Sequence, residues 1–259
     1  MAADQLDNKL TLTPLRGVPL VQPGDDLAAI VTQALATSNE SLQPRDVLIL
    51  AQKIVSKAEG RRVDLKTVKP SQRAFEFAHA TQKDPRVVEL ILAESTEVLR
   101  HRPGAIIVAH RLGFVLANAG IDASNVGADG DEHVLLLPAD PDRSCRELRA
   151  KLRERTGVDV AMLIIDSFGR AWRNGTVGTA IGVSGFPGLA DLRGKPDLFG
   201  RPLQITEVGL ADELAAAASL MMGQAAEGAP IVLARGVPYE RRESGVQELI
   251  RPKAQDLFR

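Results

Sequence analysis

The strongest constraint on the fold is a run of six apolar residues that ends at an acid, residues 160–165 (VAMLII) followed by Asp166. An apolar run with β-branched members is typical of a buried strand. Open α/β sheets bind their ligands just beyond the carboxyl ends of the strands. Asp166 therefore lies where a ligand is expected. Either a bound divalent metal ion or a capped turn would explain a carboxylate at that place.

A second polar segment, residues 118–127 (NAGIDASNVG), follows an apolar run that we expect to be a strand at residues 114–117. Glycine lets the backbone approach a ligand closely, and Asp122 offers a hard oxygen for a divalent cation. The same residue types dominate ordinary turns, so this segment alone favours a surface turn. Asp122 and Asp166 are each followed or preceded closely by a small hydroxyl residue and a glycine. Because two such acids occur in the chain, a divalent-metal site is the preferred interpretation.

Composition excludes several classes of protein. The chain has 259 residues, 44% of them hydrophobic, which is enough for one large domain or two smaller ones. Its 32 basic residues nearly balance 33 acidic ones, and aromatic residues make up 3%, so we expect no nucleic-acid partner. Cys145 is the only cysteine, which excludes an intrachain disulfide. No signal peptide is recognisable, and no uncharged apolar run approaches the ~20 residues of a membrane helix, so we expect a cytoplasmic protein without a membrane partner.

The remaining pattern predicts a mixed architecture. Strands are expected at residues 46–51, 105–109 and 229–234, and the second of these should form a hairpin with 114–117. Helices are expected at 27–37, within 71–97 as two segments, at 140–156 and at 211–222. Asp25 or Asp26 is a candidate N-cap for the helix at 27–37, and Gly157 should end the helix at 140–156. The predicted fold class is α+β (mixed α/β), with mixed sheets and peripheral helices.

Two basic stretches are candidate anion sites. Lys53, Ser56 and Lys57 follow the strand at 46–51 directly and suit phosphate oxygens, although a solvated basic loop would have the same composition. Neither a P-loop nor a G-x-G-x-x-G motif occurs in the chain. Arg170 and Arg173 could hold a phosphate or carboxylate bidentately, or could be ordinary surface arginines. The glycine-rich run that follows, residues 175–185, suggests close backbone packing or approach to a ligand.

Four motifs occur in an order that resembles the coenzyme F-420:L-glutamate ligase family: QKIVSKAEG at 52–60, NAGIDASN at 118–125, DSFGR at 166–170 and MGQ at 222–224. The resemblance extends from Gly17 to about Gly236 and implies the GTP-dependent γ-glutamyl ligase of deazaflavin coenzyme biosynthesis. It implies that Asp122, Asp166 and Ser167 bind divalent metal ions. Gln224 matches a further ligand, and some relatives have an acidic residue there, which would hold a cation more strongly.

The resemblance also implies a nucleotide site, with Lys57, Asp122 and Asp166 as the catalytic residues. The implied GTP contacts are Val18, Pro19, Leu20, Val21, Ala51, Gln52, Lys57, Asn125, Met222, Gly223, Gln224, Ala225, Ala226, Glu227, Gly228 and Ala229. It implies the ligase fold of that family in a single domain over residues 1–259, as one body or two closely associated lobes. The C-terminal nitroreductase-like domain of some bacterial relatives is not expected.

The implied reaction joins L-glutamate to coenzyme F-420-0 through an acyl phosphate, releasing GDP and phosphate, in a homodimer. Mg²⁺ or Mn²⁺, two per subunit, would bridge phosphate oxygens, with K⁺ as a further candidate ion. Lys57 would offset developing negative charge, and we hypothesise that Arg170 and Arg173 bind acidic groups of the coenzyme precursor or of glutamate. A metal-dependent nucleotide phosphohydrolase and a non-catalytic GTP-binding protein remain as alternatives.

Overall fold

The computed structural model describes residues 9–123 and 132–257. Within these residues the central sheet has five strands in the order β1-β12-β2-β8-β9. These are β1 (Thr11–Pro14), β12 (Ile231–Arg235), β2 (Val47–Ala51), β8 (Ala161–Arg170) and β9 (Arg173–Ser184). β2 and β8 run parallel, and the other neighbours are antiparallel. The mixed sheet and its covering helices confirm the predicted α+β class.

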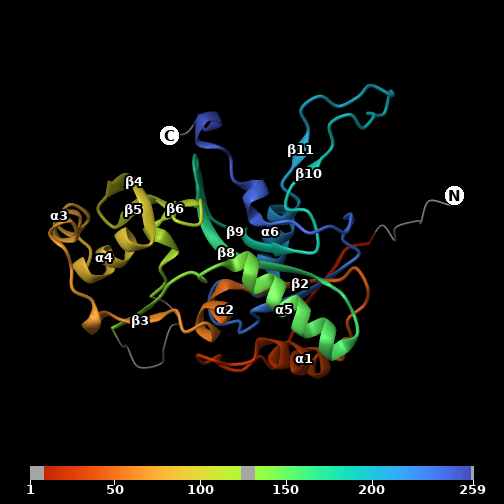
Figure 1. Ribbon diagram of the computed structural model, residues 1–259, viewed down its shortest axis with the longest axis horizontal. Coiled ribbons are helices and arrows are strands. Elements are labelled where there is room, and N and C mark those ends of the chain that lie inside the picture. The colour runs from red at the N-terminus through yellow and green to blue at the C-terminus, as the bar shows by residue number, and fades with distance from the viewer. Residues whose placement is uncertain (1–8, 124–131, 258–259) are drawn as a thin grey trace.

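Helices cover both faces of this sheet (Figure 1). α1 (Leu27–Thr37) packs on α5 (Pro141–Thr156), which contacts β8 and β9, and α6 (Leu210–Met222) packs on the opposite face. The inner strands β2, β8 and β12 are buried over most of their length, so their apolar side chains form the main core. The expected helices at 27–37, 140–156 and 211–222 and the strands at 46–51 and 229–234 are therefore confirmed.

The helix ends follow from local hydrogen bonding. Asp26 Oδ1 accepts from the backbone N–H of Ala28 at 3.0 Å, which is the cap predicted for α1. Asp140 caps α5 in the same way. The helix ends at Gly157, whose φ of 73° is left-handed and favours glycine.

Two glycines of β9 explain how closely the helices approach the sheet. A Cβ added to Gly178 would lie 2.3 Å from the carbonyl oxygen of Ala215 in α6. A Cβ on Gly182 would lie 2.6 Å from the backbone of Pro141 in α5. The glycine-rich run is therefore a surface on which helices from both sides pack against bare backbone, and the predicted close packing is confirmed.

A side lobe lies beside the main sheet, at the left of Figure 1. Its antiparallel sheet has the order β4-β5-β6, with strands Ser95–Arg102, Ala105–His110 and Val115–Ala117. The helices α3 (Gln72–Thr81) and α4 (Pro85–Ala93) pack on it around a separate apolar cluster. The predicted β5–β6 hairpin and the helix break before Pro85 are confirmed, but the prediction of helix as far as residue 97 is wrong, because β4 begins at Ser95 and pairs with β5.

Among the described residues, two short pairs of strands lie outside these two sheets. β3 (Arg62–Asp64) pairs with β7 (His133–Leu135), and β10 (Ala190–Asp191) pairs with β11 (Glu207–Val208). The chain between β10 and β11 forms an arm that projects from the body in Figure 1. A tail with 3-10 turns at Val246–Leu249 and Lys253–Gln255 follows β12. None of the helices in the described part of the chain has the length and apolarity to cross a membrane.

Glu94, at the end of α4, holds the side lobe to the main body. Its carboxylate accepts from Arg61 Nη2 and Arg111 Nε, both at 3.0 Å, and His110 Nε2 lies 3.5 Å away. Arg61 and Arg111 also donate to backbone carbonyls at Leu137 and Ala139, so the cluster spans both parts. Burial by itself would raise the pKa of Glu94, but His110 and the two arginines outweigh it and lower this pKa to about 2.

We expect Glu94→Gln to destabilise the protein by about 2 kcal/mol at pH 7. Because the pKa is depressed from 4.5 to about 2, the carboxylate stabilises the fold above pH 4.5 and loses this effect as the pH falls toward 2. Urea unfolding of both proteins between pH 7 and pH 2.5 measures the difference, which should shrink at low pH. Glu147→Gln, at an exposed ion pair with Arg143, is the control and should change stability by less than about 0.5 kcal/mol. A difference that stays constant with pH would contradict this account.

Candidate active site

Asp166 lies where the parallel pairing of the main sheet ends. β8 pairs with β2 only as far as Ile165, opposite Ala51. The prediction that the strand ends at Asp166 is wrong, because β8 continues to Arg170. β9 supplies hydrogen-bond partners along this extension, where Asp166 is directly opposite Thr179. Asp166 is thus the first residue beyond the edge at which β2 gives way to a helix, which keeps it at the expected ligand-binding edge.

The basic segment after β2 is the helix α2 (Gln52–Ala58) and not a solvated loop. Lys53 and Lys57 are four residues apart and therefore lie on one side of the helix. Gln52 and Ser56 are buried, and Ser56 Oγ donates to Gln52 Oε1 at 2.8 Å. This bond fixes the orientation of the amide, whose Nε2 donates to Asp122 Oδ2 at 2.8 Å.

A left-handed turn places Asp122. Asn118, Ala119 and Gly120 have φ values of 53°, 54° and 66°. Left-handed backbone at a residue other than glycine costs on the order of 1 kcal/mol or more, and such strain gathers at functional sites. Asn118 Oδ1 offsets part of it by accepting from the N–H of Ile106 at 3.1 Å. Asp122 then forms two backbone hydrogen bonds with Leu135, at 3.0 and 2.8 Å, so the segment is built into the fold.

The structure brings the two predicted acids together. Asp122 Oδ2 lies 3.5 Å from Lys53 Nζ, yet burial raises the pKa of Asp122 despite this lysine and Gln52. Burial, together with the negative charge of Asp122, raises the pKa of Asp166 from 3.8 to about 7. Two carboxylates that disfavour each other's charge in this way form an arrangement that a divalent cation would stabilise.

Ser167 and Gln224 meet at the same place from different elements. Ser167 Oγ donates to Gln224 Oε1 at 2.9 Å, and Gln224 follows the end of α6. Their oxygens and those of Asp122 and Asp166 are the hard donors that Mg²⁺ and Mn²⁺ prefer. The described residues contain no cluster of three or more His, Cys, Asp or Glu that could hold a metal. A metal here would therefore depend on this mixed set of carboxylates, hydroxyl and amide, whose metal-binding role stays a prediction.

A cavity of about 650 Å³ opens beside Asp166 and Ser167, within the usual size range for small-molecule sites. The residues proposed as nucleotide contacts, apart from one, line it from three distant segments. They are Val18, Pro19, Leu20, Val21, Ala51, Gln52, Lys57, Met222, Gly223, Gln224, Ala225, Ala226, Glu227, Gly228 and Ala229. The exception, Asn125, lies outside the described residues. Three of the four motifs thus line one cavity, and the roles of their residues remain predictions.

Positive charge gathers along this cavity. Lys53, Lys57 and Arg62 all line it. Burial and the charges of Lys53 and Arg62 lower the pKa of Lys57, so the site favours an anion that relieves this repulsion. Lys53 belongs to the predicted anion site but was missing from the implied GTP contacts, and Arg62 was missing from both. Arg62 reaches the cavity from β3, and no motif or spacing in the sequence indicates it.

Comparison with known proteins identifies the family. The family model described as "F420-0:Gamma-glutamyl ligase" matches residues 17–236. The chain is 46% identical over 252 residues to the coenzyme F420:L-glutamate ligase of Methanothermobacter thermautotrophicus, covering 96% of this chain and 99% of that protein. It is 49% identical over 249 residues to the enzyme of that name from Methanopyrus kandleri, with 93% and 96% covered. It is 40% identical over 251 residues to the one from Archaeoglobus fulgidus, with 97% of each chain covered. The chain therefore belongs to the F-420-0:γ-glutamyl ligase family, and it is an enzyme of the ligase class.

Proposed function

We propose that this enzyme uses GTP to add L-glutamate to coenzyme F-420-0 through an acyl phosphate, releasing GDP and phosphate. The observation that carries the proposal is the convergence of Asp122 and Asp166 beside a cavity lined by Lys53, Lys57 and Arg62. Opposite charges arranged in this way suit a triphosphate bound with divalent cations. The relatives named for the substrate coenzyme F420 and L-glutamate support the same reaction.

Asp122, Asp166, Ser167 and Gln224 would hold Mg²⁺ or Mn²⁺, which would supply charge neutralisation for the phosphate oxygens when bound. Lys57 would stabilise the negative charge that develops on the transferred phosphoryl group. The walls at 18–21 and 222–229 would enclose the nucleotide and exclude water from the transfer. K⁺ remains a further candidate ion.

The proposed reaction consists of two successive displacements, one at phosphorus and one at the acyl carbon. A carboxylate oxygen of F-420-0 attacks the terminal phosphorus of GTP, the P–O bond to GDP breaks, and an acyl phosphate forms. The ammonium of glutamate loses one proton, and its nitrogen then attacks the acyl carbon. The C–O bond to phosphate breaks with its electron pair, and the second proton of the nitrogen passes to the departing phosphate. The protein's task is to hold these three reactants in line.

A homodimer is part of the proposal, because the arm between β10 and β11 carries exposed apolar side chains. Leu198, Phe199 and Ile205 are 100%, 84% and 86% exposed in the single chain. Three such side chains on one projecting segment favour a protein partner, and a second copy is the simplest. Light scattering of the wild type should give twice the mass of one chain. The variant Phe199→Asp should give a lower mass, closer to that of one chain.

Two measurements test the ligase proposal. Calorimetry with GTP and Mn²⁺ should show binding. Mass spectrometry should then show glutamate-sized increments on F-420-0 that require GTP and glutamate together. Phosphate release from GTP without glutamate or F-420-0 would support the phosphohydrolase alternative. GTP binding without turnover in the presence of both substrates would support a non-catalytic GTP-binding protein.

Lys57→Met should lower kcat about 100-fold, because it removes a positive donor from the position where charge develops. The change keeps the length of the side chain and its apolar packing, so the melting temperature should stay within about 2 °C. Lys57→Arg keeps the charge and should retain more activity than Lys57→Met. Lys66→Met, in the turn after β3 and outside the cavity, is the control. Equal kcat values for Lys57→Met and the wild type would exclude a catalytic role for Lys57.

A further inference from the structure

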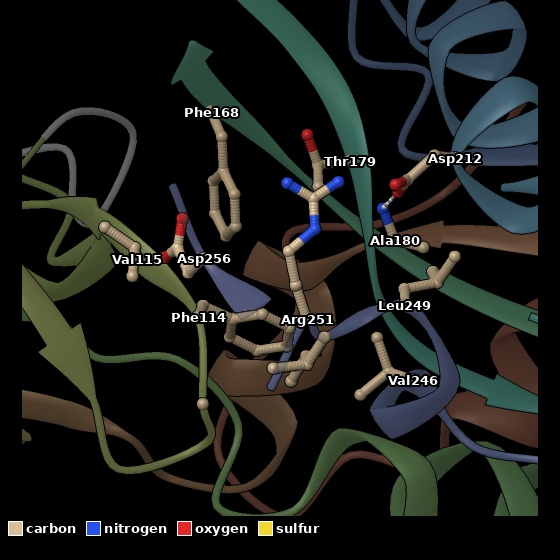
Figure 2. Close-up of a pocket in the computed structure, with 12 residues that line it drawn as sticks. Phe114, Val115, Phe168, Thr179, Ala180, Asp212, Val246, Leu249, Arg251 and Asp256 are labelled. Carbon is tan, nitrogen blue, oxygen red and sulfur yellow. Dashed lines mark hydrogen bonds between the residues drawn. The ribbon is translucent and has the colours of Figure 1, made fainter. Parts of the chain in front are cut away.

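A second, smaller pocket of about 240 Å³ lies between the β8–β9 hairpin, the side lobe and the C-terminal tail (Figure 2). It is below the usual range for a nucleotide-sized ligand. Phe114 and Phe168 form an edge-to-face pair in its wall, with ring centroids 5.9 Å apart. Its polar side chains are Thr179, Asp212, Arg251 and Asp256.

This pocket adjoins the carboxylate pair of the active site. Thr179 is directly opposite Asp166 in the antiparallel register of β8 and β9. Directly opposed residues of an antiparallel pair have their side chains on the same face, about 5 Å apart. Phe168 follows Asp166 by two positions and therefore also lies on that face. A ligand in this pocket would thus lie one residue pair from the place where the phosphoryl group is expected.

The pocket offers one cationic group, Arg251, and two carboxylates, Asp212 and Asp256, to a ligand. Arg251, Thr179 and Asp212 all line this pocket and are labelled in Figure 2. Within the described residues, Arg251 makes no hydrogen bond or ion pair. Asp212 accepts from the N–H of Ala180 at 2.9 Å through Oδ1. A planar guanidinium of this kind suits a carboxylate, which it can bind with two parallel hydrogen bonds.

The tail that carries Arg251 is anchored on both sides of it. Val246 N–H donates to both carboxylate oxygens of Asp142 at 3.1 Å, and Gln247 Nε2 donates to Leu112 O at 3.1 Å. Lys253 Nζ pairs with Glu97 at 2.8 Å. The fold therefore holds Arg251 over the pocket, while its side chain stays open to solvent.

We propose that this pocket binds the incoming L-glutamate, with Arg251 holding a carboxylate and Asp212 holding the ammonium group before it is deprotonated. The inference rests on the proposed ligase function, to which it adds the site of the acceptor amino acid. It leaves Arg170 and Arg173, at the exposed end of the β8–β9 hairpin, to the acidic groups of the coenzyme precursor.

The test compares Arg251→Ala, Arg251→Lys and the wild type. Because the side chain has no protein partner among the described residues, Arg251→Ala should keep the wild-type melting temperature. It should raise the KM for glutamate about 10- to 100-fold, as expected for a lost charge-assisted pair, with the KM for GTP unchanged. Arg251→Lys should be intermediate. Arg100→Ala, at an exposed arginine of β4 that lines neither pocket, removes the same positive charge and should leave the KM for glutamate within twofold.

Asp212→Asn provides a second variant, because its amide oxygen can still accept from Ala180. It should weaken glutamate binding and leave the binding of glutarate, which has no amine, unchanged. Direct titration of glutamate, followed by NMR, separates the ligase proposal from the proposal that this pocket binds glutamate. A wild-type protein that binds glutamate through Arg251 yet makes no product would overturn the ligase proposal alone. An active wild type whose KM for glutamate is the same in Arg251→Ala would overturn the pocket assignment alone.

Discussion

Asp166→Asn is expected to lower the kcat of glutamate ligation at least about 100-fold, which is the loss usual when a metal site is disturbed. The substitution keeps the shape of the side chain and removes one of the two charges that a divalent cation would bind. Binding of Mn²⁺, measured by calorimetry or electron paramagnetic resonance, should weaken with it. Asp84→Asn makes the same chemical change at the cap of α4, where asparagine caps equally well, and should leave kcat unchanged.

The same variant should be more stable than the wild type when metal is removed. The pKa of Asp166 is raised from 3.8 to about 7, so the neutral form is favoured in the folded protein. The wild type therefore loses stability as the pH rises through this interval, and at pH 8 we expect Asp166→Asn to be more stable by about 2 kcal/mol. Added Mn²⁺ should reverse the order, since it stabilises only a protein that binds it. Urea unfolding at pH 8 measures the stabilities of the wild type and of Asp166→Asn, once with a chelator and once with Mn²⁺. If the same protein is the more stable one under both conditions, the metal assignment is refuted.

Gly178→Ala should have the largest effect on stability of any substitution considered. Its Cβ would lie 2.3 Å from the carbonyl oxygen of Ala215 and 2.7 Å from Ser219 Cβ, so α6 must move away from the sheet. Overpacking of this kind costs about 3 kcal/mol, which corresponds to a fall in melting temperature of about 6–12 °C for a chain of this size.

Gly169→Ala is the matched control, because no atom lies within 4 Å of the Cβ that it would add. It should change the melting temperature by less than about 2 °C. Calorimetry of the two variants compares them directly. If Gly178→Ala melts like the wild type, the close packing of α6 against β9 is wrong. Since Gly178 is opposite Ser167 and α6 leads into Gln224, Gly178→Ala should also weaken Mn²⁺ binding.

Much of the local structure could be predicted because its causes are local. The cap at Asp26 and the stop at Gly157 depend on hydrogen bonds and backbone preferences within a few residues. The glycine spacing of β9 predicted close packing, because only glycine tolerates another backbone at that distance. The prediction failed at Asp166, where β8 continues, because the neighbouring β9 provides hydrogen-bond partners that no local pattern reveals.

Motifs in the sequence identified most of the site residues, but the charges and contacts of these residues could be described only from the fold. Asp122 and Asp166 are in different elements, and a left-handed turn and the end of the β2–β8 pairing bring their charges together. Arg62 and Arg251 reach their pockets from β3 and from the tail, and neither lies in a motif. Such residues are recognised only when segments distant along the chain are placed side by side.

By itself the sequence determined most of the helices, the strands of the main core, the mixed α+β class and the family, because these depend on short-range patterns and on uncommon motifs. The tertiary structure alone decided which charged groups face one another. Long-range packing sets the distance between two carboxylates and how far water is excluded from them, and these two quantities raise the pKa of Asp166.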